Sequence, residues 1–233
     1  MSTVQGARAR ARTEITAAIK GEARKQLAAE GASKLSLRAV ARELGMASSA
    51  LYRYFPSRDD LLTALIVDAY DAVGEAAERA LAQAAPADAP AERWVAVCGA
   101  VRTWALAHPH EYALIYGSPV PGYTAPQATV GPASRVALVL IGIVRDAHQG
   151  RGIAVPRPAP GLRAEGERMA ADFAPGLPPA VGPALVAAWA QLFGLISFEL
   201  FGQFHRVVEE RDAFFAHAAG ALASSVGLVL PGE

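Results

Sequence analysis

Apolar residues recur every three or four positions along most of this chain, which is the spacing of one face of an α-helix. In the first such stretch the apolar positions are Ile15, Ile19, Ala23 and Leu27. They predict a helix over 13–30, with Thr13 as its N-cap and Gly31 as its stop. The same spacing predicts helices over 36–44, 48–54, 57–84, 91–107, 127–148, 182–207 and 211–229, and a short helix that opens at Pro109.

Segments rich in proline, glycine and alanine separate the predicted helices. Residues 85–90 form a linker, and residues 117–126 and 150–163 are predicted loops, the second of which we expect to be mobile. Runs of Val, Ile and Thr, which favour strands, are scarce, whereas alanine is abundant. The sequence therefore predicts an all-α protein.

Composition places the chain among folded proteins of a reducing cytoplasm. Apolar residues make up 52% and charged residues 19% of the 233 residues, which excludes a disordered chain and permits a sizeable core. The single cysteine, Cys98, cannot form a disulfide within the chain. No apolar stretch follows the arginines of residues 1–14, so we expect no secretory signal there.

The two parts of the chain differ in charge although the total is zero. Residues 1–60 contain eleven Lys and Arg against six Asp and Glu, and residues 61–233 contain eleven against sixteen. Such asymmetry suggests a polyanion as the partner of the basic part, although a solvated basic face has the same composition. Residues 1–12 carry three of these arginines, and we expect them to form a disordered basic arm.

The predicted helices 36–44 and 48–54 are joined by a tight turn at Gly45, which is the arrangement of a helix-turn-helix. The second helix of such a motif enters the major groove of DNA, so its exposed end needs small or polar residues. That end reads Ala47, Ser48, Ser49 and Ala50. We expect Leu51 and Phe55 in the core, and Tyr52 on the surface. The side chains able to reach phosphates are Tyr52, Arg53, Tyr54 and Arg58.

Residues 35–62, LSLRAVARELGMASSALYRYFPSRDDLL, closely resemble the DNA-binding domain of the TetR family of regulators. The resemblance implies a three-helix helix-turn-helix domain over 1–56 and a larger helical domain over 57–233 for ligand binding and dimerisation. It also implies the contacts to double-stranded operator DNA: Ser36 and Arg38 near the backbone, Ser48, Ser49 and Ala50 at base edges, and Tyr52, Tyr54 and Arg58 on phosphates.

Three positions depart from the usual pattern of that family. Ala47 stands where Ser or Thr is common, Ser48 where Lys or Arg is common, and Arg58 where Lys is common. The recognition helix is therefore poor in side chains that bind a base through two hydrogen bonds. We therefore expect Arg53 and the basic arm to contribute more to DNA binding.

The segment 189–194, WAQLFG, resembles one C-terminal subgroup of the same family, in which a Trp is followed by a His-Gly pair. Phe193 stands at the position of that His. The resemblance therefore implies a related C-terminal domain, but it does not carry over any chemistry of the His.

The apolar C-terminal helices offer an interface between two copies of the chain. The spacing is carried by Leu185, Trp189, Leu192, Ile196, Leu200 and Gln203 in 182–207, and by Phe214, Ala218, Leu222, Val226 and Val229 in 211–229. Two such helices from each subunit would form a four-helix interface. The resulting two-fold symmetry places two recognition helices on an inverted repeat.

A membrane span is the alternative for this region, because residues 173–198 contain no charged side chain. Prolines interrupt the first half, and the uninterrupted helical part, 184–198, is shorter than the roughly 20 residues that a span needs. We therefore expect a buried helix and no contact with a membrane.

Aromatic residues of the central and C-terminal helices are candidates for an effector pocket: Trp104, Tyr112, Tyr116, Phe173, Trp189, Phe193 and Phe198. Few polar groups accompany them, which favours a small apolar or aromatic ligand. The predicted function is a dimeric repressor that such a ligand releases from a palindromic operator. A regulator that needs no ligand, or an activator, is the alternative.

Catalysis is a remote alternative that rests on His108, His110 and Glu111. Residues so close together around Pro109 rarely converge on one metal, and Glu111 suits the first turn of a helix. The sequence contains no phosphate-binding loop, dinucleotide motif, nucleophile elbow or zinc-protease motif. We therefore predict no catalytic residue, no metal and no cofactor.

Overall fold

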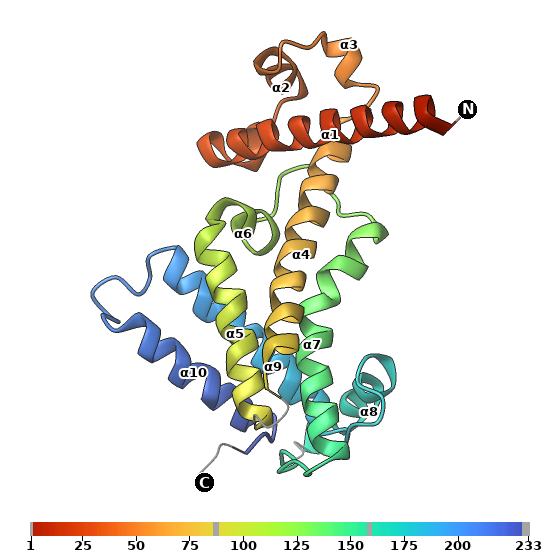
Figure 1. Cartoon of the computed structure of the whole chain (residues 1–233). Coiled ribbons are helices and arrows are strands. Elements are labelled where there is room, and N and C mark those ends of the chain that lie inside the picture. Colours follow the sequence, from red (N-terminus) through yellow and green to blue (C-terminus); the bar gives the residue numbers. More distant parts are fainter. Residues whose placement is uncertain (1, 86–88, 158–159, 230–233) are drawn as a thin grey trace. The chain divides into compact units, whose positions relative to one another are not determined.

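The computed structural model describes residues 2–85, 89–157 and 160–229, with side chains from Gly6 onward. The helices labelled in Figure 1 confirm the predicted all-α fold, and the described residues contain no strand. Parts of the predicted linker 85–90 and of the predicted loop 150–163 lie outside the described residues.

The chain folds as two compact units. Unit 1 comprises residues 1–70 and 108–132, and unit 2 comprises residues 71–107 and 133–233. The helix α4 (Arg58–Gln83) contributes residues to both. The division therefore does not coincide with the domain boundary that the sequence predicts between residues 56 and 57.

Unit 1 is built on α1 (Ser2–Glu30), against which η1 (Ala32–Lys34), α2 (Leu37–Glu43) and α6 (Pro109–Tyr116) pack. It also contains α3 (Ser48–Leu51), the first part of α4, and η2 (Gln127–Thr129). Figure 1 shows α2 and α3 on the same side of α1. The fully buried side chains of unit 1 include Tyr112, Ile19, Val40, Leu51, Leu61, Leu62 and Leu65.

α1 begins at Ser2 rather than at Thr13, so the prediction of a disordered arm is wrong for the described part of residues 1–12. Alanine and arginine alternate here, both are strong helix formers, and no proline interrupts them. The Thr13 hydroxyl is not an N-cap, because it donates to the carbonyl oxygen of Ala9 at 3.1 Å within the helix. The predicted stop is confirmed, since Gly31 has a φ of 79°.

The ends of α2 agree with its sequence signals. The Ser36 hydroxyl accepts a hydrogen bond from the Ala39 N–H at 3.4 Å, as an N-cap does. Gly45 has a φ of 63° directly after the helix. The next N–H, of Met46, donates to the carbonyl oxygen of Ala41 at 2.8 Å, which closes the end of the helix.

α3 is shorter than the predicted range 48–54. Regular helix ends at Leu51, and a turn carries the chain to Phe55, whose N–H still donates to the Leu51 carbonyl oxygen at 3.1 Å. Leu51 and Phe55 are both buried, as predicted. The two anchors therefore fix α3 to the core of unit 1.

Unit 2 contains the rest of α4, α5 (Pro90–Ala107), most of α7 (Val130–Gln149), and α9 (Val181–Leu200) with α10 (Arg211–Ser225). Between α7 and α9 lie η3 (Pro160–Leu162) and α8 (Arg163–Asp172). α5 packs against α9 and α10, and α8 packs against α9 (Figure 1). The buried Cys98 lies on α5, and this burial raises the pKa of its thiol to about 12, so the thiol stays protonated.

The sequence pattern does not predict α8, because the segment is polar and has Gly166 near its centre. Ion pairs of Arg168 with Glu165 and Asp172 connect successive turns of this helix. Gly166 is required for packing, since a Cβ at this position would lie 2.5 Å from the carbonyl oxygen of Pro179. The missing side chain lets α8 approach the segment that precedes α9.

Both C-terminal helices end before the predicted limits of 207 and 229. α9 ends at Leu200, and both Gly202 and Arg206 then adopt positive φ, at 86° and 59°. α10 ends at Ser225, before Gly227 with a φ of 92°. Residues with positive φ cannot continue a right-handed helix.

Five of the eleven residues predicted to form the interface over 182–207 and 211–229 are buried inside the chain, so the prediction is wrong for these five. Leu185, Leu192 and Ile196 are buried within the chain, as are Leu222 and Val226. These residues follow the helical spacing because they pack in the core of unit 2. The large apolar residues that α9 and α10 expose are Val186, Trp189, Phe198 and Phe214.

Two helical segments, Gln127–Gln149 and α9, are long and apolar enough to span a membrane by length and composition. The prediction that the helical part of 173–198 is too short is wrong, because α9 has 20 residues and accommodates Pro183 in its first turn. The side chain of Glu199 near its end is buried and binds Arg102 at 2.7 Å. α9 therefore contributes a charged side chain, together with Leu185, Leu192 and Ile196, to the core of unit 2.

Candidate functional site

The exposed face of α3 and the turn after it combines small polar side chains with a tyrosine and a cation. Ser48, Ser49 and Arg53 are exposed, and Tyr52 is 41% exposed, which confirms its predicted place on the surface. The buried Leu51 holds the opposite side of the helix. The major groove of DNA admits a helix that presents such a face.

α2 and the first turn of α3 present fewer polar groups. Arg38 is exposed, whereas Ser36 and Ala50 are half-buried. The Ser36 hydroxyl serves as the cap of α2, and its N–H donates to Gln26 Oε1 at 3.3 Å. Ser36 therefore connects α2 to α1, and these contacts within the chain already use its hydroxyl and its N–H.

Two groups of cations in unit 1 differ in their partners, and Lys25, Arg42 and Arg58 belong to neither because each pairs with a carboxylate close to it in the sequence. In the first group, Lys20 and Arg24 bind Asp68 at 2.7 and 2.6 Å, and Arg24 also binds Glu111 at 3.2 Å. The second group forms no ion pair with any residue that the structure describes: Arg8, Arg10, Arg12, Lys34, Arg38 and Arg53. The first group holds the helices of unit 1 together, and the second is available for phosphate oxygens.

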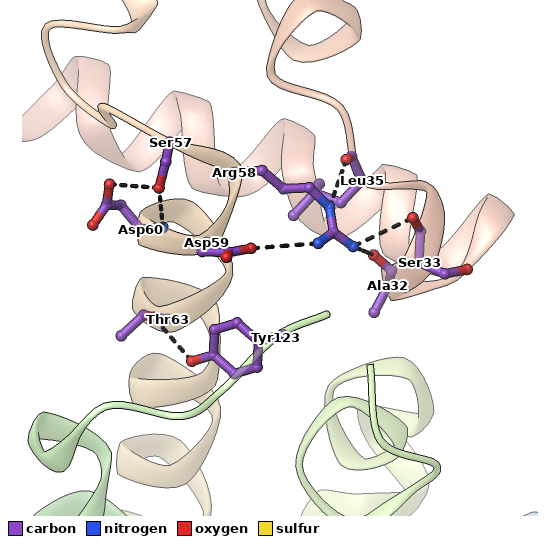
Figure 2. Close-up of polar contacts among 9 residues, drawn as sticks. All are labelled: Ala32, Ser33, Leu35, Ser57, Arg58, Asp59, Asp60, Thr63 and Tyr123. Atoms are coloured by element: carbon purple, nitrogen blue, oxygen red, sulfur yellow. Dashed lines mark hydrogen bonds and ion pairs between the residues drawn. The ribbon is translucent and has the colours of Figure 1, made fainter. Parts of the chain in front are cut away.

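The guanidinium group of Arg58 is engaged inside unit 1 (Figure 2). Its Nη2 donates to the carbonyl oxygens of Ala32 and Ser33 at 2.8 and 3.3 Å, and its Nε donates to that of Leu35 at 3.2 Å. Its Nη1 lies 3.4 Å from the Asp59 carboxylate. The side chain thus connects the start of α4 to η1 and to the residue that follows it, just before α2. This geometry favours a structural role, and a phosphate contact by Arg58 stays a prediction.

Two further contacts in Figure 2 fix the first turns of α4. Ser57 Oγ accepts from the Asp60 N–H at 3.1 Å and donates to the Asp60 carboxylate at 2.7 Å, which confirms the predicted cap at Ser57. Thr63 Oγ1 and the Tyr123 hydroxyl lie 2.9 Å apart. The start of α4 is therefore held by its own cap, Ser57, and by Tyr123 from the segment after α6.

Tyr54 is half-buried, and the guanidinium carbon of Arg12 lies 5.2 Å from the centre of its ring. Sequence reasoning missed this contact because it placed Arg12 in a disordered arm. The strong helix propensity of the alternating Ala and Arg residues was the available signal. The contacts of Arg58 with backbone carbonyls have no comparable signal in the sequence.

The predicted effector residues are divided between the units. Tyr112 and Tyr116 belong to unit 1, and the other five belong to unit 2. In unit 2, Phe173 and Trp189 line an open pocket of about 230 Å³ together with residues of α7 and α9. All of its lining residues except Ser134 are apolar. The structure therefore brings two of the predicted residues together in one apolar pocket.

The remaining candidates do not line this pocket. Trp104 and Phe193 are buried, and Phe198 is exposed. Tyr112 is fully buried, with its ring centre 5.2 Å from that of Tyr116, and burial raises the pKa of the Tyr116 hydroxyl. These aromatic residues have the environment of structural side chains, except for Phe198.

The residues of the remote catalytic alternative do not form a metal site. The Glu111 carboxylate binds Arg24, and His110 is exposed. Within residues 2–85, 89–157 and 160–229, no group of three potential ligands is placed to hold a metal ion.

Comparison with known sequences assigns both parts of the chain. Residues 21–65 match the family described as bacterial regulatory proteins, tetR family, and residues 94–222 match the tetracyclin repressor-like C-terminal domain. The HTH-type transcriptional regulator Rv1816 of Mycobacterium tuberculosis is 41% identical over 206 residues. This alignment covers 85% of the present chain and 86% of Rv1816.

Solved structures show the same fold. SCO4313, described as a regulatory protein, is 33% identical with a TM-score of 0.78, and the match covers 92% of this chain and 98% of that one. A regulatory protein of the tetR family from Rhodococcus RHA1 has a TM-score of 0.64 at 18% identity, with coverages of 92% and 98%. The helix-turn-helix, the two matched domains and the 41% identity to a regulator together show that this chain belongs to the TetR family of transcriptional regulators.

Proposed function

We propose that this regulator is a cytoplasmic, homodimeric repressor that binds a palindromic operator and leaves it when a small apolar or aromatic molecule binds. The observation that supports the DNA-binding part is the exposed face of α3, which is small and polar and belongs to the same unit as six cations that pair with no carboxylate in the described part of the chain. Membership in a family of DNA-binding regulators supports the same assignment.

We propose roles for individual residues of the helix-turn-helix. The base edges are contacted by Ser48, Ser49 and Ala50, and the phosphates by Arg38, Tyr52, Arg53 and Tyr54. Ser36, the N-cap of α2, is proposed to lie near the DNA backbone because of its position at the start of that helix. Because α3 lacks a side chain that binds a base through two hydrogen bonds, we expect the operator sequence to be read partly through DNA shape.

The salt dependence of binding tests the DNA-binding part, with Arg53→Gln compared with Lys25→Gln. Arg53 has no ion-pair partner among the described residues, whereas Lys25 is exposed and pairs with Glu22. Losing one phosphate contact per half-site should reduce the slope of log Kd against log salt by about 0.9 for each half-site. Only Arg53→Gln should show this change.

The duplex for this titration is the one that the wild-type protein selects from a randomised pool, with DNA upstream of its own gene as a second probe. Selection of an inverted repeat supports a two-fold dimer on DNA. Failure to select any sequence at low salt would contradict the proposed function.

The dimer is supported by the apolar residues that α9 and α10 leave exposed. Phe198 is 53% exposed and Phe214 is 39% exposed, and the Phe204 ring stacks edge-on against both. Large exposed aromatic residues at adjacent positions are typical of protein interfaces. A second copy of the same chain satisfies this surface by two-fold symmetry.

Phe198→Asp combined with Phe214→Asp should convert the dimer to a monomer, because two carboxylates in each subunit would have to be buried. Analytical ultracentrifugation measures the mass, and circular dichroism confirms the fold. Leu106→Asp, at an exposed position of α5, is the control and should leave the dimer intact. A double variant that sediments as a dimer would place the interface elsewhere.

The effector is proposed to bind the apolar pocket lined by Phe173 and Trp189. Its volume of about 230 Å³ lies below the range of roughly 300–1,000 Å³ that is common for drug-sized ligands. We therefore expect an effector with one or two rings. A ligand that binds the free dimer better than the DNA-bound dimer weakens operator binding by the ratio of the two affinities.

A further inference from the structure

The N-terminal turns of α1 carry cations that the helix-turn-helix does not use. Arg8, Arg10 and Arg12 are exposed, and no described residue forms an ion pair with them. No acidic residue precedes Glu14 in the sequence. Figure 1 shows these turns extending beyond α3 within unit 1. A positively charged helical segment therefore projects from the unit that contains the recognition helix.

One of these arginines is held against the segment that follows α3. The Arg12 guanidinium carbon lies 5.2 Å from the centre of the Tyr54 ring, and the Tyr54 N–H donates to the Leu51 carbonyl oxygen at 2.8 Å. A guanidinium group over an aromatic ring is attracted by the negative face of that ring. The contact thus orients Arg12 relative to α3, and the Arg12 guanidinium group forms no hydrogen bond with any described residue.

The geometry of the helix separates the three arginines by direction. Arg8 precedes Arg12 by four residues, so both lie on nearly the same face of α1. Arg10 lies two residues away, which is roughly 200° around the helix from Arg12. Arg8 and Arg12 therefore share the side that faces Tyr54, and Arg10 points to the other side.

We propose that Arg8 and Arg12 form a second DNA-contacting element, which binds phosphates next to the groove that α3 enters. This inference rests on the proposed function, because it requires α3 to dock on the operator. Phosphate contacts position a protein on the duplex, and two cations with unused donors and no carboxylate partner among the described residues are suited to that role. The Arg12–Tyr54 contact holds this element next to the segment that follows the recognition helix.

The test compares Arg12→Gln with Arg10→Gln, which remove the same charge two residues apart. Both are titrated with salt on the duplex that the wild-type protein selects from a randomised pool. Arg12→Gln should reduce the slope of log Kd against log salt by about 0.9 per half-site, and Arg10→Gln should leave it unchanged. Equal slopes for both variants and the wild type would overturn the proposal, as would equal losses in both variants.

A second measurement locates the contact on DNA. Neutral methylphosphonates replace the phosphates of the selected duplex one at a time. At the phosphate that Arg12 binds, the replacement should weaken DNA binding by the wild type but not by Arg12→Gln. If no phosphate behaves in this way, the assignment is overturned. If the wild type binds tightly while Arg12→Gln is unimpaired, only this element fails. If the wild type selects no duplex, the proposed function fails with it.

Discussion

Glu199→Ala should lower the free energy of unfolding by about 3–5 kcal/mol, because it leaves a buried guanidinium without its main partner. The Glu199 carboxylate accepts from Arg102 Nε and Nη2, both at 2.7 Å, and the two side chains are only 6% and 13% exposed. This pair is the largest cause of the raised pKa of Arg102. The ion pair joins α5 to α9. The guanidinium carbon of Arg102 also lies 5.1 Å from the centre of the Phe215 ring of α10.

Asp212→Ala is the matched control for this prediction. The Asp212 carboxylate binds the same guanidinium group, also at 2.7 Å, but its side chain is 95% exposed. Asp212→Ala should lower the free energy of unfolding by about 1 kcal/mol or less, because an ion pair with an exposed carboxylate is weakened by competition with water. Replacing the buried pair by Arg102→Met with Glu199→Leu should cost less than Glu199→Ala alone. Urea denaturation measures all three, and equal losses at Glu199 and Asp212 would show that burial does not set the difference.

The helix-turn-helix was predictable because its signals act over a few residues. Ser36 and Ser57 cap the helices that follow them, and Gly45 ends α2 in a conformation that glycine adopts at no cost. Leu51 and Phe55 are buried because their spacing places them on one side of the chain. None of these features depends on a distant part of the protein.

The outward face of α9 was not predictable from the same kind of pattern. A core and an interface impose the same helical spacing, so the sequence cannot separate the buried Leu192 from the exposed Trp189. α8 was missed for the opposite reason, because its stability depends on packing against a neighbouring segment, with Gly166 at the contact. Both outcomes are decided by tertiary contacts.

The candidate site shows the same division between local and distant information. The small and polar residue types on α3 can be read from the sequence, and the DNA contacts predicted for them follow from the resemblance of residues 35–62 to a known family. The partners of Arg12 and Arg58 are another matter, because Tyr54 lies 42 positions beyond the former and Ala32 lies 26 positions before the latter. Sequence reasoning assigned Arg58 to phosphate by its place at a helix start, whereas the structure also gives it three backbone carbonyls.

Arg58→Ala should reduce operator affinity by roughly ten- to hundredfold without changing the salt dependence of binding. The side chain donates to carbonyl oxygens on η1 and just before α2, and hydrogen bonds from a charged donor are worth about 1.5–3 kcal/mol. Without them the connection between α1 and α2 loses its attachment to α4. The recognition helix then has to be ordered at the moment of binding, which costs affinity.

Arg58→Lys separates this role from a phosphate contact. A lysine keeps the positive charge but cannot reproduce the planar fork that reaches Ala32, Ser33 and Leu35 together. If Arg58 braces the helix-turn-helix, Arg58→Lys should lose affinity almost as Arg58→Ala does, and both should keep the wild-type salt slope. If Arg58 binds phosphate instead, Arg58→Lys should bind nearly as well as the wild type, and only Arg58→Ala should reduce the slope, by about 0.9 per half-site. The slope therefore decides whether this arginine acts on the DNA or on the protein that reads it.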